Sequence, residues 1–226
     1  MPRQPDPELE EKILGAASRL WARGGEKSLT MRAVARAAGT TTPTVYERYR
    51  DRDDILLALR LKTRRELFAV MSRTRGLRDA IESYIKFALE NRHSYEVLFD
   101  GVGRPPSLYE PWPSFNLMRT RLAQQLKETP RQNNRLMLAI WCLMHGTAML
   151  ILRGEFEGAL RVQAVHACMD AVDNLIRTAA KRKGGANSGP KWPANLILGE
   201  GEQSRVGNAN EAAEIGRARP RKAKKV

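Results

Sequence analysis

The chain has 226 residues, of which 42% are hydrophobic and 28% charged, and it carries a formal net charge of +14 with a pI near 10.3. This composition is ordinary for a soluble protein that folds, and the length suits one large domain or two small ones. No apolar run approaches the roughly 18 residues of a membrane span and no apolar N-terminal stretch resembles a signal peptide, so we expect a cytoplasmic protein with no membrane partner.

The basic excess lies at the two ends of the chain. Residues 1–65 carry a net charge of +5, residues 66–180 of +2 and residues 181–226 of +7. Such an excess favours a polyanionic partner, either nucleic acid or an anionic membrane surface. Cys142 and Cys168 lie in predicted apolar helices without metal-ligand spacing. They are predicted to be core residues in a reducing setting, with no metal and no cofactor.

The first predicted helix begins at Pro7 and ends at the pair Gly24 and Gly25. Its apolar residues recur at the spacing of one buried helix face: Ile13, Ala16, Ala17, Leu20 and Trp21. Thr30 is then the predicted N-cap of a second helix, which Gly39 stops. The apolar face of that helix is formed by Met31, Val34, Ala35 and Ala38.

A third, short helix is predicted from Thr41 or Thr42 to Tyr49, and a long fourth helix from about Asp53 to Thr74. Apolar periodicity predicts further helices over 77–92, 94–100, 112–128, 132–153 and 158–181. The Gly- and Pro-rich residues 101–113 indicate a loop. Because helix 132–153 is apolar nearly all round, we expect it to be buried on several sides, one of them at a subunit interface. The predicted fold class is all-α.

The second and third predicted helices, separated by Gly39, have the pattern of a helix-turn-helix. The second helix of such a pair enters the major groove of DNA. The residues TTPTVYERY suit that role because threonine and tyrosine hydroxyls reach phosphates and base edges. Tyr49, four residues after Val45, is expected in the core, and Tyr46 at the DNA. The alternative is a solvated helix hairpin with two packing tyrosines.

The stretch LTMRAVARAAGTTTPTVYERYRDRDDILLAL, residues 29–59, resembles the DNA-binding segment of the TetR family of bacterial transcriptional regulators. The resemblance implies that Tyr46 and Arg52 contact phosphate, that Thr30 caps its helix and touches the DNA backbone, and that the threonines after Gly39 face the DNA. Arg52 replaces the usual lysine, and Arg48 stands where histidine or tyrosine is common. The full predicted set of DNA-binding residues is Thr30, Arg32, Thr41, Thr42, Pro43, Thr44, Tyr46, Arg48 and Arg52.

The stretch LAIWCLMHGTAML resembles a C-terminal subclass of this family named for its Trp-His-Gly signature. The resemblance implies a homodimer packed through the last two long helices, and a small-molecule effector pocket in each C-terminal domain. The predicted pocket residues, with loop 101–113 as a lid, are Tyr84, Phe87, Phe99, Trp112, Trp141 and His145. Tyr95, Tyr109 and Phe115 are further aromatic candidates for the same lining. The alternative for each aromatic residue is ordinary core, and for His145 a hydrogen-bonded core residue.

Three segments are therefore expected. Residues 1–52 form a helix-turn-helix DNA-binding domain, residues 53–181 an effector-binding and dimerisation domain, and residues 182–226 a disordered basic tail. The tail is either a solvated flexible end or a source of sequence-independent contacts to DNA.

The function expected from this resemblance is that of a transcriptional repressor. It would bind a near-palindromic double-stranded DNA operator and leave it when an effector binds, with helix 53–74 as the lever. One alternative is an architectural DNA-binding protein that needs no effector. An enzyme is disfavoured because the sequence has no Ser-His-Asp set, Walker loop, Rossmann glycine pattern or metal spacing, and has only three histidines.

Overall fold

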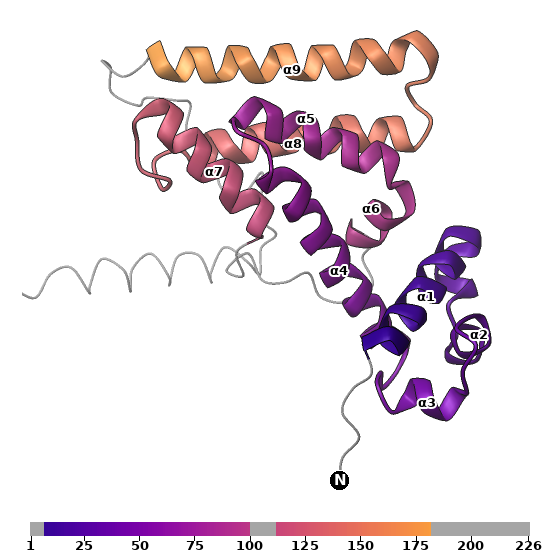
Figure 1. Cartoon of the computed structure of the whole chain (residues 1–226). Coiled ribbons are helices and arrows are strands. Elements are labelled where there is room, and N and C mark those ends of the chain that lie inside the picture. Colours follow the sequence, from indigo (N-terminus) through magenta and orange to yellow (C-terminus); the bar gives the residue numbers. More distant parts are fainter. Residues whose placement is uncertain (1–6, 100–111, 182–226) are drawn as a thin grey trace, which may run out of the picture. The chain divides into compact units, whose positions relative to one another are not determined.

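The computed structural model describes residues 7–99 and 112–181, which all lie in one compact unit, as α-helices joined by short turns (Figure 1). No strand occurs among these residues, and the all-α prediction is confirmed. The helices are α1 Pro7–Ser28, α2 Met31–Ala37, α3 Thr42–Tyr46, α4 Arg52–Ser72, α5 Leu77–Glu90, α6 Arg92–Phe99, α7 Pro113–Leu126, α8 Asn134–Leu152 and α9 Gly158–Lys181.

Two helix boundaries near the N-terminus differ from those that the sequence predicts. The regular turns of α1 stop at Gly24 and Gly25 as expected, but these residues form a kink with non-helical angles, and helical structure resumes up to Ser28. Helix α3 ends at Tyr46 rather than Tyr49, and the chain leaves it through a turn before α4 begins. The third helix is therefore a single short element between two turns.

The first four helices surround a hydrophobic core of their own. Helix α4 contributes only its first half to this core, and one residue comes from α6, namely Val97. The other members are Ile13, Leu14, Ala17, Trp21, Leu29, Met31, Val34, Ala35, Val45, Tyr49, Ile55, Leu56 and Leu59. Helices as short as α2 and α3 are not stable alone, so their stability depends on packing in this core.

A second, larger core lies among α5, α7, α8 and α9. The second half of α4 enters it through Leu67 and Met71, and α6 enters it through Tyr95 and Leu98. Helices α4 and α6 thus each contribute to both cores. These two helices provide the packed connection between the first three helices and the rest of the unit.

Arg121 on α7 closes the turn between α4 and α5. One terminal nitrogen, Nη1, donates to the carbonyl oxygens of Met71 and Gly76 at 3.3 and 3.1 Å and to Oγ1 of Thr74 at 2.6 Å. The other, Nη2, donates to the carbonyl oxygen of Thr74. The carbonyl oxygens of Met71 and Gly76 also accept bonds from Thr74 and Ala80, so Arg121 adds to these bonds, and its charge matches the partial negative charge at the end of α4.

Helix α8 departs from two expectations. An 18-residue window of its 19 residues has a mean hydropathy of 1.7, so one helix of the described chain is as long and as apolar as a membrane span, contrary to the sequence-based estimate. Core helices of other proteins meet the same criterion, and α8 packs against α5, α7 and α9. Only 33% of α8 is buried, and Cys142 is exposed on it, whereas Cys168 on α9 is buried as predicted.

Several sequence-based predictions lie outside the described residues. They are the basic tail over 182–226 and nearly all of the loop predicted over 101–113. The last residue of that loop, Pro113, is instead the first residue of α7, where its missing N–H group costs no hydrogen bond.

Candidate nucleic-acid interface and aromatic cluster

Helix α2 begins at a threonine cap. Thr30 has extended backbone angles, φ −114° and ψ 150°, and its Oγ1 accepts a hydrogen bond from the N–H group of Ala33 at 3.2 Å. This bond pairs one of the N–H groups that a helix start leaves free. The predicted cap is therefore present, and Thr30 itself is exposed.

The turn after α2 depends on Gly39. Its φ of +69° lies in the left-handed region, which costs a residue with a side chain roughly 1–2 kcal/mol. The N–H group of the next residue, Thr40, donates back to the carbonyl oxygen of Ala35 at 3.0 Å. Gly39 thus reverses the chain within a few residues and sets the direction of α3.

Helix α3 also begins at a threonine cap. Oγ1 of Thr41 accepts a hydrogen bond from the N–H group of Thr44 at 3.3 Å. The Oγ1 atoms of Thr41 and Thr44 lie 2.8 Å apart. Pro43 occupies the first turn of α3, and Thr41 and Pro43 are exposed while Thr42 and Thr44 are half-buried. The start of α3 therefore presents hydroxyl groups whose orientation is already fixed by a mutual hydrogen bond.

The two tyrosines of this segment have opposite environments. Tyr46 is 54% exposed, whereas Tyr49 is 7% exposed and packs in the first core with Val45. Burial, and secondarily the negative charge of Glu10, raises the pKa of Tyr49 to about 12. The Tyr49 hydroxyl has no hydrogen-bond partner among the described residues. Tyr49 therefore fixes the segment to the core and leaves Tyr46 available for contact.

Two arginines before and in α4 are paired with acidic residues. Arg50 binds Asp54 through Nε and Nη2 at 2.8 and 2.9 Å, and these bonds lower the pKa of Asp54 to about 2. Arg52, predicted to contact phosphate, has its Nη2 2.8 Å from Oε1 of Glu26 and its Nε 3.5 Å from Oδ1 of Asp53. Neither pairing is predicted by the sequence.

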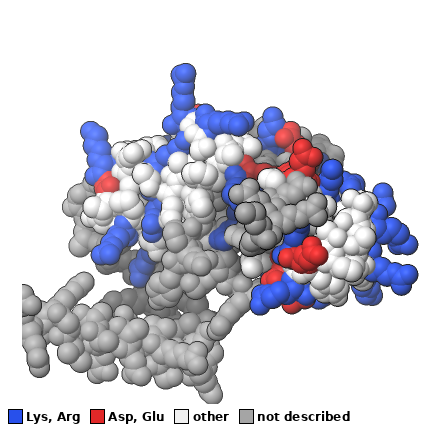
Figure 2. All heavy atoms as spheres, turned by 60° about the horizontal axis from the view of Figure 1, so that its bottom comes forward, with Lys and Arg blue, Asp and Glu red and all other residues white. Residues whose placement is uncertain are grey.

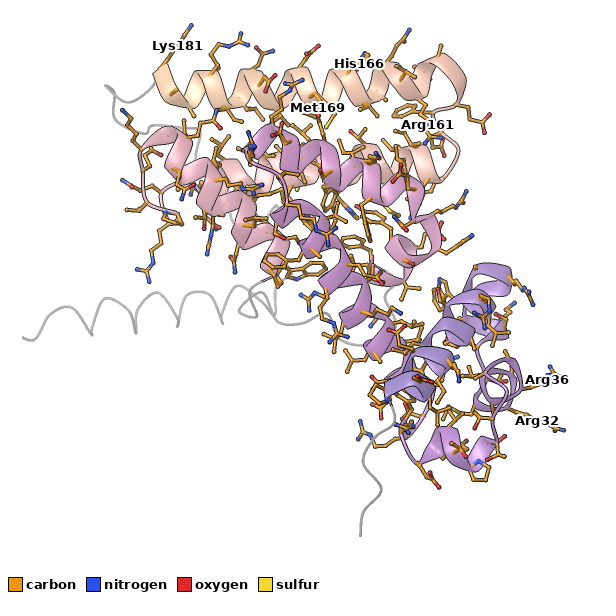
Figure 3. The ribbon with its side chains drawn as sticks, in the orientation of Figure 1. Arg32, Arg36, Arg161, His166, Met169 and Lys181 are labelled. Atoms are coloured by element: carbon orange, nitrogen blue, oxygen red, sulfur yellow. The ribbon has the colours of Figure 1, made fainter. Side chains whose placement is uncertain are left out.

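Three other arginines near α3 have no salt bridge within the described chain: Arg32, Arg36 and Arg48. Figure 3 shows the side chains of Arg32 and Arg36 pointing away from α2. Figure 2 shows lysine and arginine side chains around the outer edge of the part built from α1, α2 and α3. Arg36 was not among the predicted residues, although its four-residue spacing from Arg32 places both on one helix face.

Five of the six predicted pocket residues lie together in an aromatic cluster, which we define as Tyr84, Tyr95, Phe99, Trp112, Trp141 and His145. The Phe99 ring lies 4.1 Å from the ring of His145, centroid to centroid, and stacks on Trp112 at 5.6 Å. His145 stacks on Trp141 at 5.4 Å, and the Arg64 guanidinium lies 4.1 Å from the centre of Trp112. These contacts join α4, α5, α6 and α8 with the residue that precedes α7.

A hydrogen-bond chain runs through this cluster. The hydroxyl groups of Tyr84 and Tyr95 lie 2.7 Å apart, and the Tyr95 hydroxyl lies 2.7 Å from Nδ1 of His145. Burial lowers the pKa of His145, so its ring is neutral at pH 7. Because a phenol is a stronger donor than a neutral imidazole, we assign the proton so that Tyr95 donates to Nδ1 and Nε2 keeps the ring hydrogen.

Two residues change places relative to the predicted pocket. Phe87 is buried in the second core and has no ring contact with the cluster among the described residues. Tyr95, fully buried, holds the central place in the hydrogen-bond chain; it was one of the further aromatic candidates and not one of the six predicted pocket residues. Its spacing of four residues from Phe99 was the available signal, since it puts both rings on one face of α6.

Two family models match the chain. The model of bacterial regulatory proteins of the tetR family matches residues 13–59, and that of a tetracyclin repressor-like C-terminal domain matches residues 77–175. The first match covers α2 and α3, and the second covers all six residues of the aromatic cluster. The resemblance to the Trp-His-Gly subclass stays a prediction. No curated protein matches the sequence.

Solved structures share the fold. A protein of unknown function from Rhodococcus sp. RHA1 has a TM-score of 0.61 and 23% identity, over 80% of this chain and 99% of its own. TetR from Acinetobacter baumannii AYE has a TM-score of 0.54 and 15% identity, over 75% of this chain and 95% of its own. At these identities the similarity extends to the arrangement of helices only.

Proposed function

Since the chain belongs to the TetR family of bacterial transcriptional regulators, we propose that it is a repressor released from a palindromic operator by a small-molecule effector. The observation that carries this proposal is the opposite burial of Tyr46 and Tyr49 on a capped segment after a glycine turn. A segment packed only for stability would not leave a tyrosine half exposed beside capping hydroxyl groups and arginines without salt bridges. No catalytic role is proposed.

Helix α3 is the proposed reading element. Thr41, Thr42, Pro43 and Thr44 enter the major groove, where hydroxyl groups bond base edges and methyl groups contact thymine. Tyr46 and Arg48 extend this surface along the chain, and the Tyr46 hydroxyl donates to a phosphate. Thr30, Arg32 and Arg36 on the preceding helix bind phosphate without reading sequence.

Arg52 is proposed to contact a DNA phosphate by leaving the carboxylates with which it is paired in the free protein. Its guanidinium is paired with Glu26 and Asp53 in the free protein, so a phosphate has to compete with two carboxylates. Exposed ion pairs are worth at most about 1 kcal/mol, so the exchange is inexpensive. Glu26 thereby weakens the non-specific attraction of Arg52 to DNA, so that Arg52 binds phosphate mainly at sites whose bases match α3.

Two copies are proposed to pair through α8 and α9. A stripe with four-residue spacing runs along α8: Leu138, Cys142 and Leu150 are exposed on it, and Gly146 is half-buried. Leu160 and Val162 add exposed apolar surface on α9. A Cβ atom placed at Gly146 would meet no atom within 4 Å, so a neighbouring helix has room to approach there. Twofold pairing sets the two α3 helices about 34 Å apart on one face of the operator.

The aromatic cluster is the proposed effector site, with Tyr84, Phe99, Trp112, Trp141 and His145 as its walls and Phe87 behind them. The proposed domain limits are residues 1–52 and 53–181, followed by the tail, residues 182–226, and the proposed location is the cytoplasm. Because α4 and α6 pack in both cores, a shift of either helix changes the spacing of the α3 helices. The change in operator affinity can be no larger than the difference in effector affinity between the two conformations.

Selection from random DNA tests the function. The full chain is mixed with random duplexes, bound duplexes are amplified, and the enriched sequence is compared with a scrambled one by fluorescence anisotropy. We expect an inverted repeat that is bound roughly 10³-fold more tightly or better. A ratio near one would instead support an architectural protein. Small molecules are then screened for release of the enriched duplex.

A further inference from the structure

An open cleft with a volume of about 590 Å³ lies where the end of α1, helix α6 and the end of α8 meet. It is distinct from the aromatic cluster, although Phe99 lines both. Small-molecule sites commonly have volumes of about 300–1,000 Å³. The cleft therefore has the size of a site for a small organic molecule.

The lining of the cleft is apolar in one part. Trp21 from α1, Phe99 from α6, and Met149 and Leu152 from α8 contribute to it. Trp21 and Leu152 are otherwise buried, and Phe99 and Met149 are half-buried. A ligand with an apolar ring or chain would remove the remaining apolar surface of these residues from water, which favours binding.

The charged part of the lining has an excess of positive charge. Glu96 is paired with Arg92, whose Nε lies 2.9 Å from Oε1, and it also contacts Nδ1 of His93. Glu26 is occupied by Arg52, which lies outside the lining. Arg23 and Arg153 are both exposed, and neither has a salt bridge within the described residues. Two guanidinium charges are thus left without a counter-charge.

The helix ends do not cancel this excess. The carbonyl ends of α1 and α8 each add roughly half a negative charge, and the N-terminal end of α6 adds roughly half a positive charge. The sum is smaller than the charge of one arginine. The field in the cleft therefore favours an anion.

We propose that this cleft binds an amphipathic organic anion, an apolar ring system or chain that carries one carboxylate or sulfonate group. The apolar part lies against Trp21, Phe99 and Met149, and the acidic group lies between Arg23 and Arg153. This site is additional to the effector site proposed above and does not depend on DNA binding.

The position of the cleft gives such a ligand two routes of influence. Phe99 belongs to the aromatic cluster, so a ligand that moves this ring also moves the ring of His145. Glu26 holds Arg52, so a bound anion beside Glu26 alters the ion pair of a proposed phosphate contact. The cleft thus joins the effector site to the DNA-binding surface.

The test uses 8-anilinonaphthalene-1-sulfonate, a fluorescent probe with an apolar ring system and one sulfonate. It is titrated into the full chain without DNA, into two cleft variants, Arg23→Glu and Arg153→Glu, and into the control Arg135→Glu. Arg135 is an exposed arginine at the opposite end of α8, so the control has the same change in net charge. Circular dichroism verifies that all variants are folded.

We expect each cleft variant to weaken probe binding by about tenfold, because a nearby attraction becomes a repulsion, and the control by less than about twofold. The neutral probe N-phenyl-1-naphthylamine is expected to bind the wild type and Arg153→Glu alike. Equal loss in all three variants, no loss in the cleft variants, or equal loss for the neutral probe would each overturn the proposal. None of these outcomes depends on operator binding.

Discussion

Arg60 on α4 donates its Nε–H group to the main-chain carbonyl oxygen of Val97 on α6, at 3.1 Å. Arg60 is buried, and Val97 is the residue by which α6 enters the first core. The bond therefore fastens together the two helices that contribute to both cores. A guanidinium group in this position costs desolvation energy unless its hydrogen bonds are made, so the contact is sensitive to replacement.

Replacing Arg60 with methionine should destabilise the protein. Met retains much of the apolar stem but leaves the Val97 carbonyl without this donor, at a cost of about 1–3 kcal/mol in the free energy of unfolding. Urea denaturation measures the loss. The control Arg65→Met alters an exposed arginine of the same helix and should change stability by less than about 0.5 kcal/mol. Equal stability of the two variants would show that the Arg60 bond has no structural importance.

Tyr46→Phe and Tyr49→Phe remove the same atom from two tyrosines with opposite burial. Loss of the Tyr46 hydroxyl should weaken binding to every duplex by about tenfold or more, the value of one hydrogen bond to a charged phosphate, without changing the preference between duplexes. Loss of the Tyr49 hydroxyl, which has no partner within the described chain, should leave binding unchanged and stability equal or higher. Anisotropy titrations check both. A lost preference in Tyr46→Phe would mean that Tyr46 reads bases.

Replacing Gly39 with alanine should destabilise the protein, whereas replacing Gly15 with alanine should stabilise it. Gly39 has φ +69°, so alanine there costs roughly 1–2 kcal/mol of stability. Gly15 lies within α1, where a new Cβ would meet only the flexible end of Arg19, and alanine gains up to about 1 kcal/mol. Thermal denaturation should show a lower melting temperature for Gly39→Ala and a higher one for Gly15→Ala than for the wild type. A stabilised Gly39→Ala variant would contradict the left-handed turn.

Stability should fall in mild acid because of His145. Burial lowers its pKa below the ordinary value of 6.5, so the unfolded chain binds the proton first as the pH falls. Above pH 6.5 this group makes no pH-dependent contribution. Below pH 6.5 the free energy of unfolding decreases, by at most about 1.4 kcal/mol per pH unit, until the pH passes the folded pKa.

The variant His145→Gln separates this effect from other titrating groups. Urea unfolding of both proteins at pH 7.5 and 5.5 should give a smaller loss in the variant, because His93 and His166 are common to both proteins. An equal loss would assign the pH dependence to groups other than His145.

The proposed subunit interface predicts a monomeric variant. Leu150 is 42% exposed on the α8 stripe, so Leu150→Glu should fold normally but separate the subunits, because it would bury a charge in the interface. The control is Leu57→Glu, a change at a leucine on α4 that is 49% exposed and lies outside the proposed interface. Sedimentation velocity distinguishes the states. If the Leu150→Glu protein were still a dimer, the subunit interface would not include this stripe of α8.

Short-range features of the fold could be predicted from the sequence because they follow from neighbouring residues. The Thr30 cap, the Gly39 turn and the burial of Tyr49 each depend on residues within four positions. The early end of α3 could not be predicted in this way. Periodicity continues from Val45 to Tyr49, but the chain leaves the helix one residue after Tyr46 to reach the cap of α4.

Long-range pairings could not be predicted for a physical reason. The Arg52–Glu26 ion pair joins residues from different helices, and Tyr95 meets His145 across 50 positions of the chain. Composition indicated that aromatic residues gather in the C-terminal part, but it did not distinguish Phe87, which faces the core, from Tyr95. The cleft beside Trp21 is formed by three helices, so no single stretch of sequence indicates it.

The spacing of half-sites tests the central claim most directly. The enriched duplex is compared by anisotropy with one in which five base pairs are inserted between the half-sites, which turns one half-site about half a helical turn away. If two α3 helices of a twofold dimer read adjacent major grooves, affinity should fall roughly to that for scrambled DNA. Unchanged affinity after the insertion would contradict paired reading by α3.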